Sequence, residues 1–220
     1  QAILAQACLF RHRPSPQSPR PGGSAALLPM AEAWHTLGLQ GGGRFDGRSY
    51  SQKECFEKAL GLKADYPEAW NSLGVEGGGS VNAKAYNSKE CYVKALELKA
   101  DNPYAWNNLG AEGGGSFNGK AYNRKECYVQ ALELKEDDSH AWSNLGALGG
   151  GSVSGKAYNE KECFQQALEL KADSPIVWNQ LGAEGGGSVN AKAYTTRTFG
   201  TASAWQSVGV STERHTTVNQ

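Results

Sequence analysis

The stretch AWNNLGAEGGGSFNGKAYNRKECYVQALELKEDDSH, residues 105–140, contains the pattern from which the fold of this chain can be predicted. The copy before it, residues 69–104, is identical to it at 26 of 36 positions, and the 36-residue period runs from Ala33 to Tyr194. A fixed period between about 20 and 50 residues indicates stacked repeats. Each unit of such an array buries its apolar face only against its neighbours, so we expect one repeat domain.

The first part of each copy predicts a helix, about residues 103–113 in the quoted stretch. Asn102 is a favourable N-cap, and Pro103 suits the first helical position because it has no backbone N–H to leave unpaired. Trp106 and Leu109 then lie on one face of the helix. The glycine triplet that follows ends it, because three glycines together cost about 3 kcal/mol of helix propensity.

A second helix is predicted at about residues 124–136. Asn123 stands three residues before Glu126, the spacing of a capping box, and Cys127 and Tyr128 begin an apolar stripe at helical spacing. The capping pair recurs at Ser51 and Glu54, at Asn87 and Glu90, and at Asn159 and Glu162.

A glycine-rich segment separates the two helices of each copy. We expect it to protrude as a loop that can include a brief hairpin, because Asn-Gly and Asp-Gly pairs favour tight turns with positive φ. The predicted fold class is therefore all-α, an α-solenoid of about four and a half helix-loop-helix repeats with protruding Gly-rich loops. The repeats lie near 33–68, 69–104, 105–140 and 141–176, with a half repeat at 177–194.

The two ends do not follow the pattern. Residues 1–29 are rich in Pro and Arg and contain no acidic residue, so we expect a disordered leader before a repeat domain at 30–194. A transit peptide is the alternative interpretation of that leader. Residues 195–220 are rich in Ser and Thr and are expected to form an irregular tail.

Composition excludes several function classes. The formal net charge is zero, whereas a nucleic-acid-binding protein would show a basic excess, so we expect no nucleic-acid partner. No run of about 18 apolar residues is present, so no membrane-spanning helix and no membrane partner are expected.

A phosphate-binding loop is the strongest chemical motif in the sequence. Gly114–Lys120 and Gly150–Lys156 both match GxxxxGK. The motif needs Ser or Thr after the lysine to hold Mg²⁺, but Ala121 and Ala157 follow here. A predicted helix also precedes the loop where the motif needs a strand, so no nucleotide is expected.

Metal, disulfide and catalytic chemistry receive no support either. The periodic cysteines form no CxxC pair, no histidine recurs with them, and no Ser/His/Asp set recurs. We expect buried thiols, a core ladder of tryptophans, no cofactor, no metal and no enzymatic activity. Unpaired thiols are typical of a reducing compartment, and we expect a cytoplasmic protein.

The pattern resembles the tetratricopeptide repeat family over about three quarters of the chain. The resemblance is carried by Trp106, Leu109, Gly110, Tyr128 and Ala131, and by ALEL before an Asp-containing turn. The period of 36 rather than 34 and the glycine triplet depart from that family. Sel-like repeats, with a similar helical hairpin and a period near 36, are the second resemblance, and both imply protein or peptide binding.

The tetratricopeptide resemblance also implies where a partner binds. In that family the residues just after the tryptophan position line the binding groove, and Asn side chains there could grip an extended peptide, since an amide both donates and accepts hydrogen bonds. A solvated polar face, in a structural or antigenic repeat protein without a specific ligand, is the alternative. The candidate peptide-binding residues are His35, Asn71, Asn107, Asn108, Ser143, Asn144 and Asn179.

Overall fold

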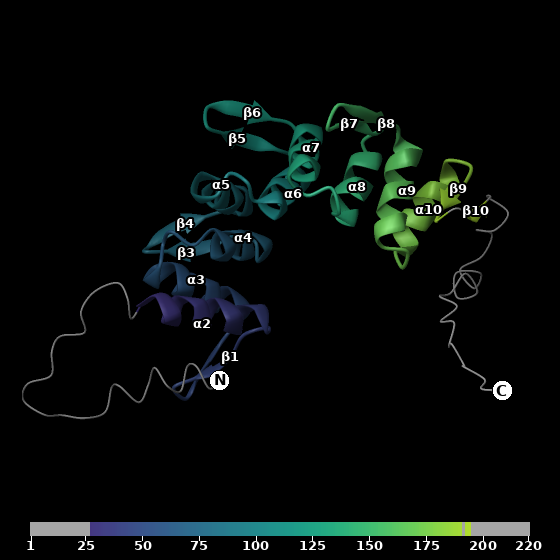
Figure 1. Ribbon diagram of the computed structural model, residues 1–220. Coiled ribbons are helices and arrows are strands. Elements are labelled where there is room, and N and C mark those ends of the chain that lie inside the picture. Colours follow the sequence, from purple (N-terminus) through teal and green to yellow (C-terminus); the bar gives the residue numbers. More distant parts are fainter. Residues whose placement is uncertain (1–26, 191, 195–220) are drawn as a thin grey trace, which may run out of the picture. The chain divides into compact units, whose positions relative to one another are not determined.

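The computed structural model describes residues 27–190 and 192–194, which contain nine helices and ten short strands (Figure 1). Each of the first four repeats consists of a first helix, a two-stranded hairpin and a second helix, and the fifth copy is described as far as its hairpin. The chain divides into two compact units, residues 1–135 and 136–220, and each is considered separately below.

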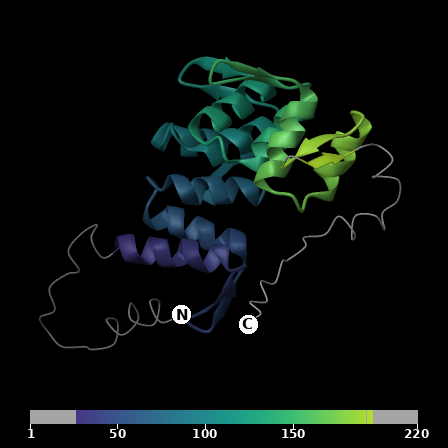
Figure 2. The same cartoon turned by 45° about the vertical axis from the view of Figure 1, so that its right-hand side comes forward.

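The first unit contains α2 to α7, which follow one another as a stack in Figures 1 and 2. Each helix packs against the next along the chain. The elements are α2 (Leu27–Leu39), β1 (Gly43–Phe45), β2 (Arg48–Tyr50), α3 (Gln52–Leu62), α4 (Pro67–Val75), β3 (Gly79–Val81), β4 (Lys84–Tyr86), α5 (Ser88–Leu98), α6 (Pro103–Ala111), β5 (Gly115–Phe117), β6 (Lys120–Tyr122) and α7 (Arg124–Leu134).

The second unit repeats the same order, with α9 packed against both α8 and α10. Its elements are α8 (Ser139–Gly146), β7 (Gly151–Val153), β8 (Lys156–Tyr158), α9 (Glu160–Leu170), α10 (Pro175–Ala183), β9 (Gly187–Val189) and β10 (Lys192–Tyr194).

The predicted N-terminal signals of the helices are confirmed. The Asn123 side chain accepts a hydrogen bond from the Glu126 N–H at 2.9 Å, and the Glu126 carboxylate accepts one from the Asn123 N–H at 2.8 Å. The other three capping boxes are also formed. Asn102 caps α6, whose first residue is Pro103, and α6 and α7 each end two residues before the predicted position.

The prediction of a purely all-α fold is not confirmed, because the loop between the helices is an antiparallel hairpin in all five copies. Asn118 and Gly119 have φ of 49° and 77°, so both turn residues are left-handed, as a two-residue type I′ turn requires. Strands of three residues are too short to show a period of two, which is why the hairpins left only a turn signal in the sequence.

The glycine triplet brings the hairpin back to the helix pair. Gly114 has a φ of 85°, and a Cβ atom there would lie 2.2 Å from the backbone oxygen of Tyr122. The Gly114 N–H donates to the carbonyl of Leu109 in the last turn of α6. Glycine is therefore required where the chain leaves the first helix, for its backbone conformation and for the close approach of the second strand.

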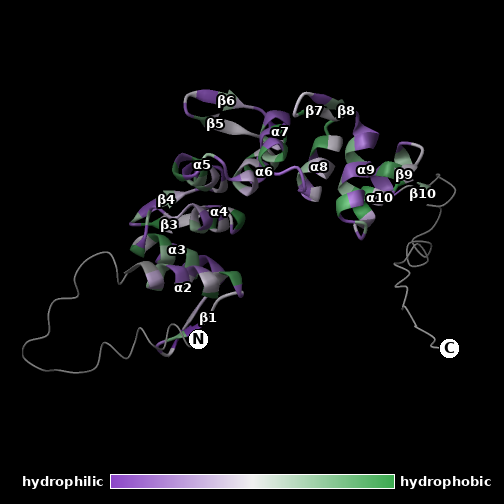
Figure 3. Cartoon of the chain, in the orientation of Figure 1, coloured by the Kyte–Doolittle hydropathy of each residue, from purple (hydrophilic) through white to green (hydrophobic). Residues whose placement is uncertain are grey.

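The core of each repeat forms around its tryptophan. The Trp106 ring is buried and contacts the Phe117 and Tyr122 rings of the hairpin, with centroid distances of 5.4 and 4.7 Å. Its indole N–H donates to the Ala100 carbonyl at 2.9 Å. Every described helix carries hydrophobic and hydrophilic residues together (Figure 3), as expected for helices with one buried side.

The ends of the repeat domain differ in part from expectation. Helix α2 begins at Leu27, so three residues assigned to the leader belong to the first helix. Residues 1–26 and the tail at 195–220, for which a disordered leader and an irregular tail were predicted, lie outside the described residues. Across the part of the chain that is described, none of the helices has the length and apolar character needed to cross a bilayer.

Candidate functional site

The predicted binding residues lie on one side of the first helices, which we call the outer face. It is formed by the four positions with spacing i, i+3, i+4 and i+7, which are Glu68, Asn71, Ser72 and Val75 in α4. The intervening residues of α4, including Trp70 and Leu73, are buried. In the first unit the outer face contains His35, Asn71, Asn107 and Asn108, and in the second unit it contains Ser143, Asn144 and Asn179.

Polar residues of the outer face bond to each other between neighbouring repeats. The Asn108 side-chain amide donates to the Asn71 side-chain oxygen at 3.0 Å, which joins α6 to α4. His35 Nε2 and Ser72 Oγ lie 3.1 Å apart in the same register, which joins α2 to α4. Side chains that were predicted to bind a peptide therefore already form hydrogen bonds between repeats. Both Asn71 and Asn108 are half-buried.

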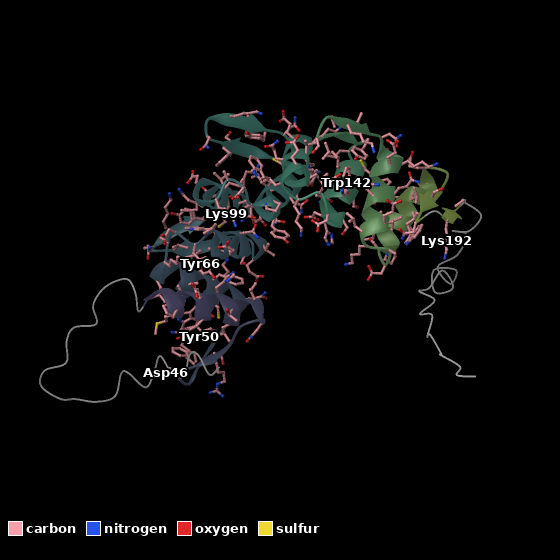
Figure 4. The ribbon with its side chains drawn as sticks, viewed as in Figure 1. Asp46, Tyr50, Tyr66, Lys99, Trp142 and Lys192 are labelled. Carbon is pink, nitrogen blue, oxygen red and sulfur yellow. The ribbon has the colours of Figure 1, made fainter. Side chains whose placement is uncertain are left out.

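His35 is the most enclosed of the predicted residues, with 8% of its surface exposed. Its Nδ1 lies 3.1 Å from the hydroxyl of Tyr66, which is labelled in Figure 4, and its ring packs against Phe56. Loss of solvation lowers the pKa of His35, and the nearby Glu68 only partly offsets this effect. His35 is therefore neutral in the folded protein near pH 7 and can offer a partner little surface.

The positions at the two ends of the outer face are more accessible. Tyr104 is 53% exposed at the start of α6, and Val75 is 61% exposed at the end of α4. Leu39 in α2 and Ile176 in α10 are exposed apolar residues at the corresponding positions. The sequence analysis did not single out these residues. Their variation from one repeat to the next is the sequence signal that could have identified them.

The sequence analysis also missed a second surface in the first unit, which consists of two grooves along the second helices α3 and α5. The α5 groove, of about 280 Å³, is lined by residues that include Lys84, Tyr86, Val93 and Ser116. One repeat earlier the α3 groove, of about 490 Å³, is lined at the equivalent positions by Arg48, Tyr50, Glu57 and Ser80. Both lie between hairpins of adjacent repeats, and only the three-dimensional register of those hairpins reveals them.

The four periodic cysteines are buried, as predicted, and none of them forms a disulfide. They are Cys55, Cys91, Cys127 and Cys163, one on each second helix. Burial raises the pKa of Cys91 to about 12 and that of Cys127 to about 11. Such thiols remain protonated near neutral pH, so they act as small apolar core residues rather than as nucleophiles.

The GxxxxGK segments form parts of the hairpins. In the segment Gly114–Lys120, the Lys120 ammonium lies over the Tyr122 ring, 4.4 Å from its centre. A helix, not a strand, precedes this segment. In the described ranges, no three His, Cys, Asp or Glu side chains are grouped so that they could hold a metal ion.

A scan against protein-family models found no match to this chain. A search of curated proteins likewise found no similar sequence.

Proposed function

We propose that this chain is a non-enzymatic protein-interaction scaffold, which binds a partner protein or an extended peptide through the outer faces of its first helices. The accessible apolar positions of these faces carry the proposal. Tyr104, Val75 and Leu39 expose more than half of their surface on one side of the first unit. Exposed aromatic and aliphatic side chains beside polar groups are typical of protein-binding surfaces.

The differences between repeats support the same surface. Trp and Leu occupy the same buried positions in all five first helices. The outer face changes from repeat to repeat, for example Glu68, Tyr104, His140 and Ile176 at one position. A scaffold that recognises one extended partner needs a constant interior and a surface with different side chains along its length.

The resemblance to the tetratricopeptide repeat agrees with this proposal, because that family binds proteins and peptides with the same side of the first helix. Buried cysteines that form no disulfide favour a reducing compartment, and we propose the cytoplasm. The alternative is a structural or antigenic repeat protein without a specific ligand. The Asn108–Asn71 bond favours that alternative, because it uses predicted binding groups within the protein.

Selection of peptides from a displayed random library against the full chain would test the proposal. We expect a selected peptide to bind Tyr104→Ala at least tenfold more weakly, because a large exposed contact is lost. Leu98→Ala is the matched control, since Leu98 is also an exposed apolar residue but lies at the end of the second helix α5. Failure to select any specific peptide, or a loss of binding only in the Leu98 variant, would contradict the proposal.

A further inference from the structure

The first strand of each hairpin has one residue whose backbone groups point away from its partner strand. Ser80 pairs with Ala85 as the second pair from the turn. In a two-residue hairpin this is a non-hydrogen-bonded pair, so the N–H and C=O of the serine face outward. Ser116 and Ser188 occupy the same place opposite Ala121 and Ala193.

In two repeats, a side chain of the preceding second helix bonds to that outward edge. The Ser80 N–H donates to the Glu57 carboxylate of α3 at 2.7 Å. In the second unit the Gln165 amide of α9 donates to the Ser188 carbonyl at 2.6 Å. Glu57 and Gln165 lie at the same position of the 36-residue period. The side chain at this position therefore supplies the hydrogen-bond partner for the outward backbone groups of the serine in the next hairpin.

The α5 groove lacks this internal partner. Val93 lies at the position equivalent to Glu57, and a valine side chain can neither donate nor accept a hydrogen bond. Val93 and Ser116 line the same groove. The outward N–H of Ser116 therefore faces a space where, one repeat earlier, a carboxylate sits.

The charges around the α5 groove favour an anionic group. Its lining includes three lysines, Lys84, Lys89 and Lys94, and two glutamates. One of the glutamates, Glu90, already accepts a hydrogen bond from the Asn87 N–H in the capping box. The other, Glu97, forms an ion pair with Lys94, so the excess positive charge of the groove comes from Lys84 and Lys89. Lys84 lies over the Tyr86 ring at 4.9 Å from its centre, which places a positive charge beside an apolar wall.

We propose that the α5 groove binds an extended acidic segment of a partner protein, with one carboxylate of that segment accepting a hydrogen bond from the Ser116 N–H. This carboxylate takes the place that Glu57 occupies in the α3 groove. An aliphatic residue next to it in the partner packs on Val93 and the Tyr86 ring. The site does not depend on the outer face of the first helices.

The test uses the full chain labelled with ¹⁵N-serine and a synthetic peptide, acetyl-Thr-Val-Glu-Val-Thr-amide. We expect the Ser116 amide resonance to shift and saturate, and the same peptide with Gln in place of Glu to bind at least fivefold more weakly. The absence of a Ser116 shift, or equal binding of the Gln peptide, would overturn the proposal.

Two variants that exchange the residues of the α3 and α5 grooves at this position make the test specific. Val93→Glu supplies the carboxylate from within the chain and should abolish the Ser116 shift, whereas Glu57→Val should open the α3 groove and add a shift at Ser80. Val129→Glu introduces the same charge on α7 and should leave the Ser116 response unchanged. A Val93→Glu variant that still binds as tightly as the wild type would show that the carboxylate does not occupy this place.

The outer face provides an independent control. Tyr104→Ala should not alter the Ser116 response to the acidic peptide, because Tyr104 does not line the α5 groove. Experiments can therefore contradict the proposed function of the outer face while supporting the acidic-peptide site, or contradict the site while supporting the proposed function. Loss of the Ser116 shift in Tyr104→Ala would contradict two separate sites.

Discussion

The two sides of the first helices differ in how much the repeats vary. On the buried side, tryptophan, leucine and glycine recur without change, as in Trp106, Leu109 and Gly110. A Cβ atom on Gly110 would lie 2.7 Å from the Tyr128 ring, so even one methyl group is too large there. On the outer side the chain accepts charged, amide, aromatic and aliphatic residues. Close packing restricts the buried side, whereas contact with solvent leaves the outer side free to specialise.

The largest effect that we expect compares two aromatic residues of α6. Trp106→Ala removes a buried ring and should lower the free energy of unfolding by about 3–5 kcal/mol. Tyr104→Ala removes an exposed ring and should lower it by less than about 1 kcal/mol. Urea unfolding followed by circular dichroism measures both values. Similar losses for the two variants would show that the outer face is as closely packed as the core.

A smaller effect is expected at a hairpin tip, where the residues are exposed but their backbone conformation is restricted. Ala83 has a φ of 64°, in the left-handed region that costs a residue with a Cβ atom about 1–2 kcal/mol. Ala83→Gly should therefore stabilise the protein by up to about 1 kcal/mol, since the greater flexibility of glycine in the unfolded chain offsets part of the gain.

The reverse change, Gly119→Ala, is the control for the hairpin tip. A Cβ atom on Gly119 would have no neighbour within 4 Å, so the change tests backbone conformation alone. It should destabilise the protein by a similar amount, as judged by the melting temperature. A destabilising Ala83→Gly would contradict the strain that we infer from the backbone angle.

The smallest expected effect is a pH dependence at the one outer-face position that is buried. Because burial lowers the pKa of His35 below its ordinary value of 6.5, the unfolded chain takes up a proton before the folded protein does. The free energy of unfolding should therefore decrease as the pH falls through 6.5 toward the lowered value. Urea unfolding at pH 7.5 and 5.5 measures this difference.

His35→Asn is the matched variant, because Asn stands at this position in three other repeats. It cannot be protonated, so the decrease in stability between pH 7.5 and 5.5 should be smaller in this variant. An unchanged decrease would assign the pH dependence to other groups.

The helices and their caps could be predicted from the sequence because their signals are local. Asn123 and Glu126 are three residues apart, and their capping box depends on little beyond that turn. The hairpins could be predicted only as a brief element that the loops could include, because strands of three residues leave the turn as the one sequence signal. The pairing of Asn71 with Asn108 could not be foreseen from either residue alone, since it depends on how closely two helices from different repeats approach. For the same reason the α5 groove was missed, because Val93 and Ser116 are 23 residues apart.

The contact between the tryptophan and the tyrosine across each of the first four hairpins has a consequence for how the chain folds. Trp34 meets Tyr50, Trp70 meets Tyr86, Trp106 meets Tyr122 and Trp142 meets Tyr158, always 16 residues apart. Closing so short a loop costs little chain entropy, and the type I′ turn at its centre is already favoured locally. Helical proteins built from such near-sequence contacts fold in microseconds to milliseconds. Each repeat can therefore begin to assemble as soon as its own 36 residues are available, before its more distant neighbours have been synthesised.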